Sequence, residues 1–136
     1  MEDTKNQVRL QEIAQVALTV DDLIKAKEFY RDVLGMNPLF DTGTMSFFQC
    51  GNIRVMLGTS EQSAGSNGTI LYFRVPEVRQ AHEILKGIGV AFVQEPHLVA
   101  RMKSHDLWLA FLKDPSGNTL GLMSEESRAS ETQQGI

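Results

Sequence analysis

Residues 111–122 have the sequence Phe111-Leu112-Lys113-Asp114-Pro115-Ser116-Gly117-Asn118-Thr119-Leu120-Gly121-Leu122. A hydrophobic segment leads into a tight turn, and a second hydrophobic segment leads out of it. Asp114 can accept hydrogen bonds from the backbone that follows it, Pro115 fixes its own φ, and Gly117 tolerates a positive φ. The sequence therefore predicts a β-hairpin whose turn is specified at several positions.

A similar arrangement occurs in the first half of the chain. Residues 47–57 alternate as a strand, pass through Gly51-Asn52 and continue as a second strand. Around these two hairpins the chain follows one order twice: a strand, a helix and three strands. Aligning Val20 with Val75 gives an internal repeat of about 55 residues. The sequence thus predicts two similar modules that share one domain.

The boundaries of the modules follow from hydrophobic periodicity and from turn residues. The first module is expected to span residues 9–59, with strands over 12–20, 37–41, 44–50 and 53–58, and a helix over 22–34. The second is expected to span residues 69–125, with strands over 69–75, 90–94, 107–112 and 119–123, and a helix over 76–87. Residues 60–68 are predicted as a flexible linker, residues 1–8 as a tail and residues 126–136 as a disordered tail.

The composition is that of an ordinary globular protein. Of the 136 residues 42% are hydrophobic and 22% are charged, which is typical of such domains. A net charge of −4 with scattered basic residues argues against a nucleic-acid partner. No apolar run approaches the ~20 residues that span a bilayer, and no signal peptide is evident. We therefore expect a cytoplasmic protein without a membrane partner, in which the single Cys50 is a buried, inert thiol.

Three groups of residues carry a family resemblance: Gln15–Leu23, Ala26–Tyr30 with Leu34-Gly35, and Asp114–Asn118. With them the chain resembles the vicinal oxygen chelate superfamily, which includes glyoxalase I, methylmalonyl-CoA epimerase, extradiol dioxygenases and bleomycin- and fosfomycin-resistance proteins. The resemblance implies an α+β fold of two βαβββ modules that form an eight-stranded incomplete barrel around a cavity. It also implies a homodimer, with the modules either side by side in one chain or exchanged between chains.

The resemblance also gives four positions at which catalytic members commonly hold one divalent metal ion. In this chain they are Gln15, Ile70, Gly121 and, depending on a one-residue register, Val55 or Met56. Only Gln15 offers an oxygen, whereas a bound metal ion takes three or four donors. We therefore expect no metal and no other cofactor. The alternative is one divalent metal ion at a non-standard site.

Side chains on the sheet faces turned away from the helices are expected to line the cavity. They offer apolar contact, hydrogen bonds and a guanidinium for an anion, which suits a small organic molecule. The candidate ligand-binding residues from these strands are Gln15, Thr19, Arg54, Met56, Tyr72, Arg74 and Met123. The two arginines also fit a second interpretation, in which they lie near strand ends and extend to water.

Residues 95–108 are predicted to form a long loop over the cavity, as a lid or as an interface. The loop contains His97 and His105, which are candidates for acid–base catalysis. It also contains Arg101 and Trp108, which are candidate ligand contacts. In the alternative interpretation Trp108 fills the core or a dimer interface, and His105 makes a structural hydrogen bond. A third histidine, His82, is predicted to be solvated on the second helix.

Three functions are compatible with these features. The favoured one is a metal-free protein that binds a small organic molecule, because the metal-ligand positions are largely lost while a mixed cavity lining remains. The second is a glyoxalase-like lyase or isomerase, or a ring-cleaving dioxygenase, that uses His97 and His105 or a non-standard metal site. The third is a dimeric adaptor without a ligand.

Overall fold

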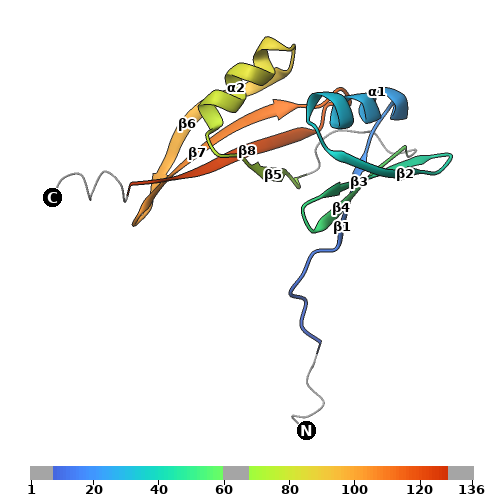
Figure 1. Cartoon of the computed structure of the whole chain (residues 1–136), viewed down its shortest axis with the longest axis horizontal. Helices are drawn as coiled ribbons and strands as arrows, with labels where there is room; N and C mark the ends of the chain where they lie inside the picture. The colour runs from blue at the N-terminus through green and yellow to red at the C-terminus, as the bar shows by residue number, and fades with distance from the viewer. Residues whose placement is uncertain (1–7, 60–67, 129–136) are drawn as a thin grey trace, which may run out of the picture.

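The computed structural model describes residues 8–59 and 68–128, and its elements follow the predicted order twice (Figure 1). The first module contains β1 (Gln15–Thr19), α1 (Leu23–Glu28), the π-helical η2 (Phe29–Val33), β2 (Asn37–Asp41), β3 (Met45–Cys50) and β4 (Ile53–Gly58). The second contains β5 (Leu71–Arg74), α2 (Val78–Gly87), β6 (Ala91–Arg101), β7 (His105–Lys113) and β8 (Thr119–Ser127). Within these described residues, no helix is both long and apolar enough to cross a membrane.

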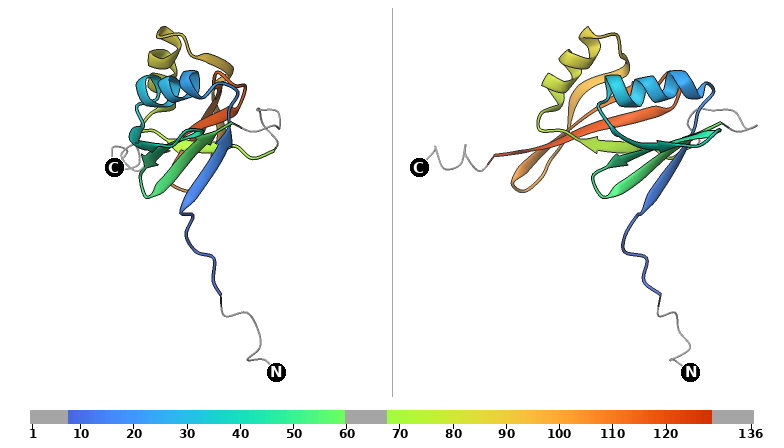
Figure 2. Two further views of the ribbon diagram at one scale, coloured as in Figure 1. Left: turned by 90° about the vertical axis from the view of Figure 1, so that its right-hand side faces the viewer. Right: turned by 45° about the vertical axis from the view of Figure 1, so that its right-hand side comes forward.

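Each module forms its own four-stranded sheet, and the two sheets have the same topology. Their strand orders are β1-β4-β3-β2 and β5-β8-β7-β6. The first and last strands of each module pair in parallel, with Ala17 opposite Met56 and Tyr72 opposite Gly121. Both helices lie on the same side of the molecule (Figure 2). This arrangement confirms the predicted fold of two βαβββ modules, although the two sheets do not close into a barrel within the chain.

The core lies between the sheets and the helices. Alternate strand residues face the helices and are fully or almost fully buried, as period-2 alternation requires. The largest of them are Phe48, Leu57, Leu112 and Leu120. The remaining strand residues face the other way, so that each sheet has one covered face and one face without a helix. We call these uncovered surfaces the open faces.

The first helix differs from the single helix predicted over 22–34. Asp22 caps its N-terminus by accepting a hydrogen bond from the Lys25 backbone N–H at 3.1 Å, as an N-cap carboxylate does. From Phe29 the winding widens to η2, which ends with a bond from the Leu34 N–H to the Phe29 carbonyl at 2.9 Å. The π-helical turn contains Tyr30, whose side chain is 0% exposed.

The turn at residues 114–118 is closed by its own side chains, as the sequence predicts. The Oδ1 atom of Asp114 accepts hydrogen bonds from the backbone N–H groups of Ser116 at 2.9 Å and Asn118 at 2.8 Å. Gly117 has a φ of 90°, a conformation that other residues rarely adopt. The conformation of the turn is therefore specified by its own residues.

The same turn joins the second module to the first. Asp114 is only 4% exposed, and its Oδ2 atom accepts a hydrogen bond from the Tyr30 hydroxyl at 2.7 Å. Two further hydrogen bonds cross between the modules: Asn118 Nδ2 to the Thr19 carbonyl at 2.9 Å, and the Asp21 N–H to Ser116 Oγ at 2.9 Å. These bonds fix the turn against the junction between β1 and α1.

Residues 95–108 form a hairpin, so the prediction of a long loop or lid is wrong. β6 continues to Arg101 and β7 begins at His105, which leaves residues 102–104 as the connection. The pairing of β6 with β7 shifts register three times between Phe92 and Ala100. Such bulges break the simple alternation by which a strand is detected in a sequence. Pro96 is tolerated because β6 is an edge strand.

The last strand, β8, continues to Ser127 alongside the extended β7. Arg128 then fixes the tip of the β6–β7 hairpin. Its guanidinium donates to the carbonyls of Met102 and Lys103 and forms an ion pair with Asp106. Most of the predicted tails and linker, at 1–7, 60–67 and 129–136, lie outside the described residues.

The Tyr30–Asp114 bond predicts a pH dependence of stability. Burial, followed by the nearby Asp114 carboxylate, raises the pKa of Tyr30. The folded state therefore keeps the phenolic proton, whereas an unfolded tyrosine loses it near pH 10. Above that pH the unfolded state binds fewer protons, so the free energy of unfolding falls as the pH rises.

We expect Tyr30→Phe to lower the free energy of unfolding at pH 7 by about 2 kcal/mol, the contribution of a hydrogen bond to a charged group. The variant should also lose stability less steeply than the wild type between pH 10 and 11. Urea unfolding at a series of pH values measures both effects. Tyr72→Phe is the control, because Tyr72 is 46% exposed. Equal alkaline slopes in wild type and Tyr30→Phe would contradict the assignment.

Candidate functional site

The open faces carry the candidate residues that were predicted from the strands. Strand register places Gln15, Arg54 and Met56 on the open face of the first sheet, and Tyr72, Arg74 and Met123 on that of the second. Thr19 lies at the end of β1, where its carbonyl accepts the bond from Asn118. The predicted face of each strand is therefore confirmed, whereas a role in binding remains a prediction.

Arg54 is held in place on the first open face. Its Nε donates to Gln15 Oε1 at 2.7 Å, and its guanidinium carbon lies 5.8 Å from the centre of the Phe47 ring. Gln15 and Arg54 are direct neighbours in the pairing of β1 with β4. Within the part of the chain that the structure describes, the two terminal nitrogens of Arg54 have no hydrogen-bond partner. They can therefore bind an anion.

Tyr72 covers Gly121 on the second open face. A Cβ atom added at Gly121 would lie 2.6 Å from Tyr72 Cδ2 and 2.9 Å from Cε2. The Tyr72 ring also makes an edge contact with Phe111, with 5.7 Å between ring centres. Gly121 is thus required by the close approach of this ring. Tyr72 and Phe111 form an aromatic surface at the positions that Ala17 and Phe47 occupy in the first module.

An exposed ion pair lies beside this aromatic surface. Arg74 on β5 pairs with Glu125 on β8, with 66% and 34% of their side chains exposed. Exposed pairs of this kind contribute little to stability. Glu126 points to the opposite side, where it pairs with Arg79 of α2 at 2.7 Å. The second open face therefore carries a neutralised guanidinium, whereas Arg54 has no acidic partner among the residues that the structure describes.

The structure does not bring the two candidate catalytic histidines together. His97 Nδ1 lies 3.0 Å from the Glu95 carbonyl, and His105 Nδ1 lies 2.9 Å from Ser104 Oγ. His97 pairs with Leu109, four residues along β7 from His105, which corresponds to ~13 Å. Each imidazole has a local hydrogen-bond partner.

The other residues of the predicted loop lie away from the open faces. Trp108 faces α2, and the guanidinium of Arg79 lies 4.3 Å from the centre of its ring, so the position agrees with the core alternative. Arg101 pairs with Asp106 in register near the hairpin tip.

His82 packs with its ring centre 4.5 Å from that of Phe92. Its Nε2 atom is buried without a partner among the described residues, so the prediction of a solvated histidine is wrong.

Sequence analysis missed two aromatic residues of the open faces. Phe47 supports the Arg54 guanidinium, and Phe111 supports the Tyr72 ring. Both lie in strands whose alternation was recognised, at positions opposite Met56 and Gly121. Extending the face assignment across the sheet to β3 and β7 would have found them.

Comparison with protein families shows to which superfamily the chain belongs. The family model of the Glyoxalase/Bleomycin resistance protein/Dioxygenase superfamily matches residues 12–122. The chain belongs to this superfamily. No curated protein sequence matches it.

Solved structures of the superfamily share the fold. A lactoylglutathione lyase from Agrobacterium tumefaciens has a TM-score of 0.70 and 23% identity, covering 85% of this chain and 94% of its own. A superfamily member from Sphaerobacter thermophilus has a TM-score of 0.72 and 22% identity, covering 85% and 98%. An antibiotic-binding protein from a Streptomyces species has a TM-score of 0.70 and 20% identity, covering 88% and 100%. At these identities the similarity shows the fold alone.

The register settles which residue of β4 belongs to the superfamily's metal-ligand positions. Met56 lies opposite Ala17 just as Gly121 lies opposite Tyr72. The set in this chain is therefore Gln15, Met56, Ile70 and Gly121, which together offer one amide oxygen and one thioether. These four side chains therefore offer fewer than the three or four donors that a divalent ion takes.

The surroundings of these positions also do not fit a metal ion. The Gln15 oxygen already accepts a hydrogen bond from the cationic Arg54, whose charge repels a divalent cation. The Tyr72 ring fills the space that a ligating side chain at residue 121 would need. Within residues 8–59 and 68–128, no group of three or more His, Cys, Asp or Glu side chains is arranged to hold a metal ion.

The contact between Tyr72 and Gly121 predicts a specific coupling. Gly121→Ala should lower the free energy of unfolding by about 1–3 kcal/mol, because the new methyl group overlaps the ring and must displace it. The loss should be smaller when Gly121→Ala is made in a Tyr72→Ala background. Urea unfolding of the four proteins of this double-mutant cycle measures the difference.

Gly43→Ala is the matched control, because nothing lies within 4 Å of a Cβ at that position. Its free energy of unfolding should stay within the small range of surface substitutions. An equal loss for Gly121→Ala with and without Tyr72 would show that the ring does not set the requirement for glycine.

Proposed function

We propose that the protein binds a small organic molecule with an acidic group on its open faces, without a metal ion. The proposal rests on Arg54. Its guanidinium is positioned by Gln15 and Phe47 and keeps its terminal nitrogens available. Such a group binds carboxylate or phosphate through two parallel hydrogen bonds. Met56 and Phe47 beside it offer apolar contact to the rest of the molecule.

Two further observations support binding rather than catalysis. A structural neighbour is described as an antibiotic-binding protein, which supports a binding role. The alternative is a lyase, an isomerase or a dioxygenase. It has less support, because the metal-ligand positions lack donors and the two candidate histidines are separated by ~13 Å along the sheet.

We also propose that two copies of the chain form a homodimer through the open faces. The two sheets of one chain do not close a barrel, and large apolar side chains remain exposed on them. Phe40 is 51% exposed and Tyr72 is 46% exposed. Because the two sheets have the same topology, the open face of one module can oppose the open face of the other module in a second copy. The ligand would then lie between the two copies.

We infer a cytoplasmic setting without nucleic-acid or membrane partners. The inference rests on the net charge of −4 and the single cysteine, because nucleic-acid sites need clustered basic residues and secreted domains commonly rely on disulfides. A small molecule and a second copy of the chain are thus the proposed partners.

A thermal-shift screen of aromatic and aliphatic carboxylates and phosphate monoesters tests the binding proposal. We expect at least one acidic compound to raise the Tm. Arg54→Met should weaken its binding by about 10- to 100-fold, the value of a charge-assisted hydrogen bond. Isothermal titration measures the affinity. Arg31→Met is the control, because Arg31 lies on η2 and pairs with the adjacent Asp32.

Elemental analysis of the same preparations, before and after incubation with zinc, nickel, iron and manganese salts, distinguishes the two functions. Near-zero metal content, together with binding of an acidic compound, supports metal-free binding. One tightly held metal ion per chain would overturn it and favour the enzyme alternative. Equal affinity of wild type and Arg54→Met would show that the anion site lies elsewhere.

Light scattering after size-exclusion chromatography tests the homodimer. We expect a mass of twice the 15.2 kDa of one chain. Tyr72→Asp should shift the protein towards the monomer, because it places a charge in the proposed interface. Ile84→Asp is the control, since Ile84 is 59% exposed on α2. A wild-type mass of one chain at micromolar concentration would contradict the proposal.

A further inference from the structure

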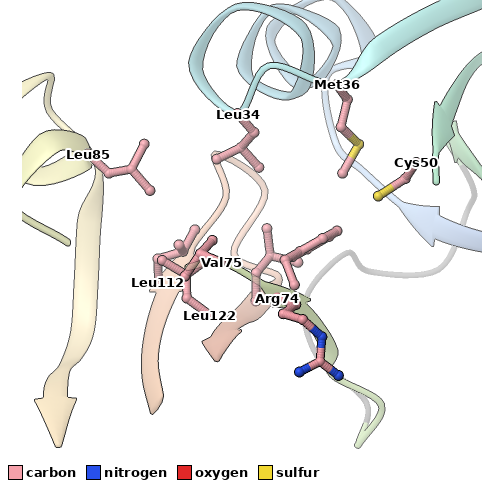
Figure 3. A pocket seen from close by; sticks show the side chains of 10 residues that line it. Leu34, Met36, Cys50, Arg74, Val75, Leu85, Leu112 and Leu122 are labelled. Carbon is pink, nitrogen blue, oxygen red and sulfur yellow. The ribbon is translucent and has the colours of Figure 1, made fainter. Parts of the chain in front are cut away.

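A cavity lies on the helix side of the sheets, between the two modules (Figure 3). Its volume is about 230 Å³. Both modules contribute to its walls, and the side chains that define it are Leu34, Met36 and Cys50 from the first module and Leu85, Leu112 and Leu122 from the second. It lies across the sheet from the open faces and is therefore separate from the proposed anion site.

The walls of this cavity are apolar. Arg74 is the one charged residue among those that line it, and its side chain extends away from the cavity (Figure 3) to pair with Glu125. Cys50 contributes a thiol, which is a weak hydrogen-bond donor. Ordered water needs two to four polar partners, and these side chains do not supply them. An uncharged, apolar molecule suits the cavity better than water does.

The size of the cavity also points to a ligand. Protein interiors are close-packed and contain few voids larger than a water molecule. An apolar cavity of about 150 Å³ stays dry and takes up benzene or xenon. The cavity between the modules is larger. Its floor consists of Leu112 and Leu122, which are 0% and 5% exposed. It therefore has room for one aromatic ring with a short substituent.

The walls can also adjust to an occupant. Met36 and Cys50 point towards each other at the edge of the first module (Figure 3), and thioether side chains adapt readily to irregular shapes. Leu85 approaches from α2 on the other side and is only partly buried. An entry path can therefore open at this rim without disturbing the buried floor.

We propose that this cavity is a second binding site, which takes one uncharged apolar molecule of single-ring size. The ligand contacts α2 and β8 of the second module and the segment around Met36 of the first. Its binding stabilises the packing of the two modules against each other. The proposal does not depend on the anion site, because the two sites share no binding side chain.

Benzene titration tests the second site. The reporter is the methyl resonance of Met36 in protein labelled with ¹³C-methyl methionine, assigned by Met36→Leu. We expect benzene to shift this resonance saturably and to raise the Tm, as a ligand of the folded state does. Leu85→Phe, which fills the cavity, should weaken benzene binding at least tenfold. Ile84→Phe makes a similar change at the next residue, which is exposed, and should leave benzene binding unchanged.

A second measurement covers the case in which Leu85→Phe does not fold. Cys50 is only partly buried, not buried as the sequence predicts, so iodoacetamide can reach its thiol. Alkylation of Cys50 in the wild-type protein should become several-fold slower when benzene occupies the cavity. An absence of any Met36 shift, equal affinity of Leu85→Phe and wild type, or an unchanged alkylation rate would each overturn the proposal. None of these results bears on the acidic ligand or on Arg54.

Discussion

The buried carboxylate of Asp114 is the constraint on which the arrangement of the two modules depends. It accepts four hydrogen bonds, three from its own turn and one from Tyr30 of the other module. A carboxylate that is removed from water is tolerated only when it is fully hydrogen-bonded. The hairpin turn of the second module is therefore complete only when the first module is docked against it. The π-helical turn η2 contributes to this contact, because it contains the buried Tyr30.

The two modules have the same backbone topology but carry different side chains on their open faces. Their strand orders and registers agree, yet Ala17 opposite Met56 in the first sheet corresponds to Tyr72 opposite Gly121 in the second. The first open face keeps room for a positioned guanidinium, whereas the second is filled by an aromatic ring. The same backbone arrangement thus carries a positioned guanidinium on one sheet and an aromatic ring on the other.

Much of this structure could be predicted from the sequence because period-2 alternation fixes which side chains share a face. The placement of Gln15, Arg54 and Tyr72 follows from it. Alternation does not give the partner across the sheet, so the bond from Arg54 to Gln15, 39 residues apart, was not foreseen. The first part of β6 was predicted, but its continuation beyond residue 94 was missed because bulges and Pro96 interrupt the pattern. His82 was misjudged because its burial depends on Phe92, which lies on another element.

The irregular β6 has a consequence for how copies of the chain can associate. It is an edge strand with exposed apolar side chains, of which Val93 is 55% and Val99 is 47% exposed. A flat edge of this composition would recruit a strand from another molecule and lead to aggregation. The three register shifts and the missing N–H of Pro96 interrupt the row of backbone donors and acceptors. The bulges thus protect the protein from open-ended polymerisation while leaving its open faces available.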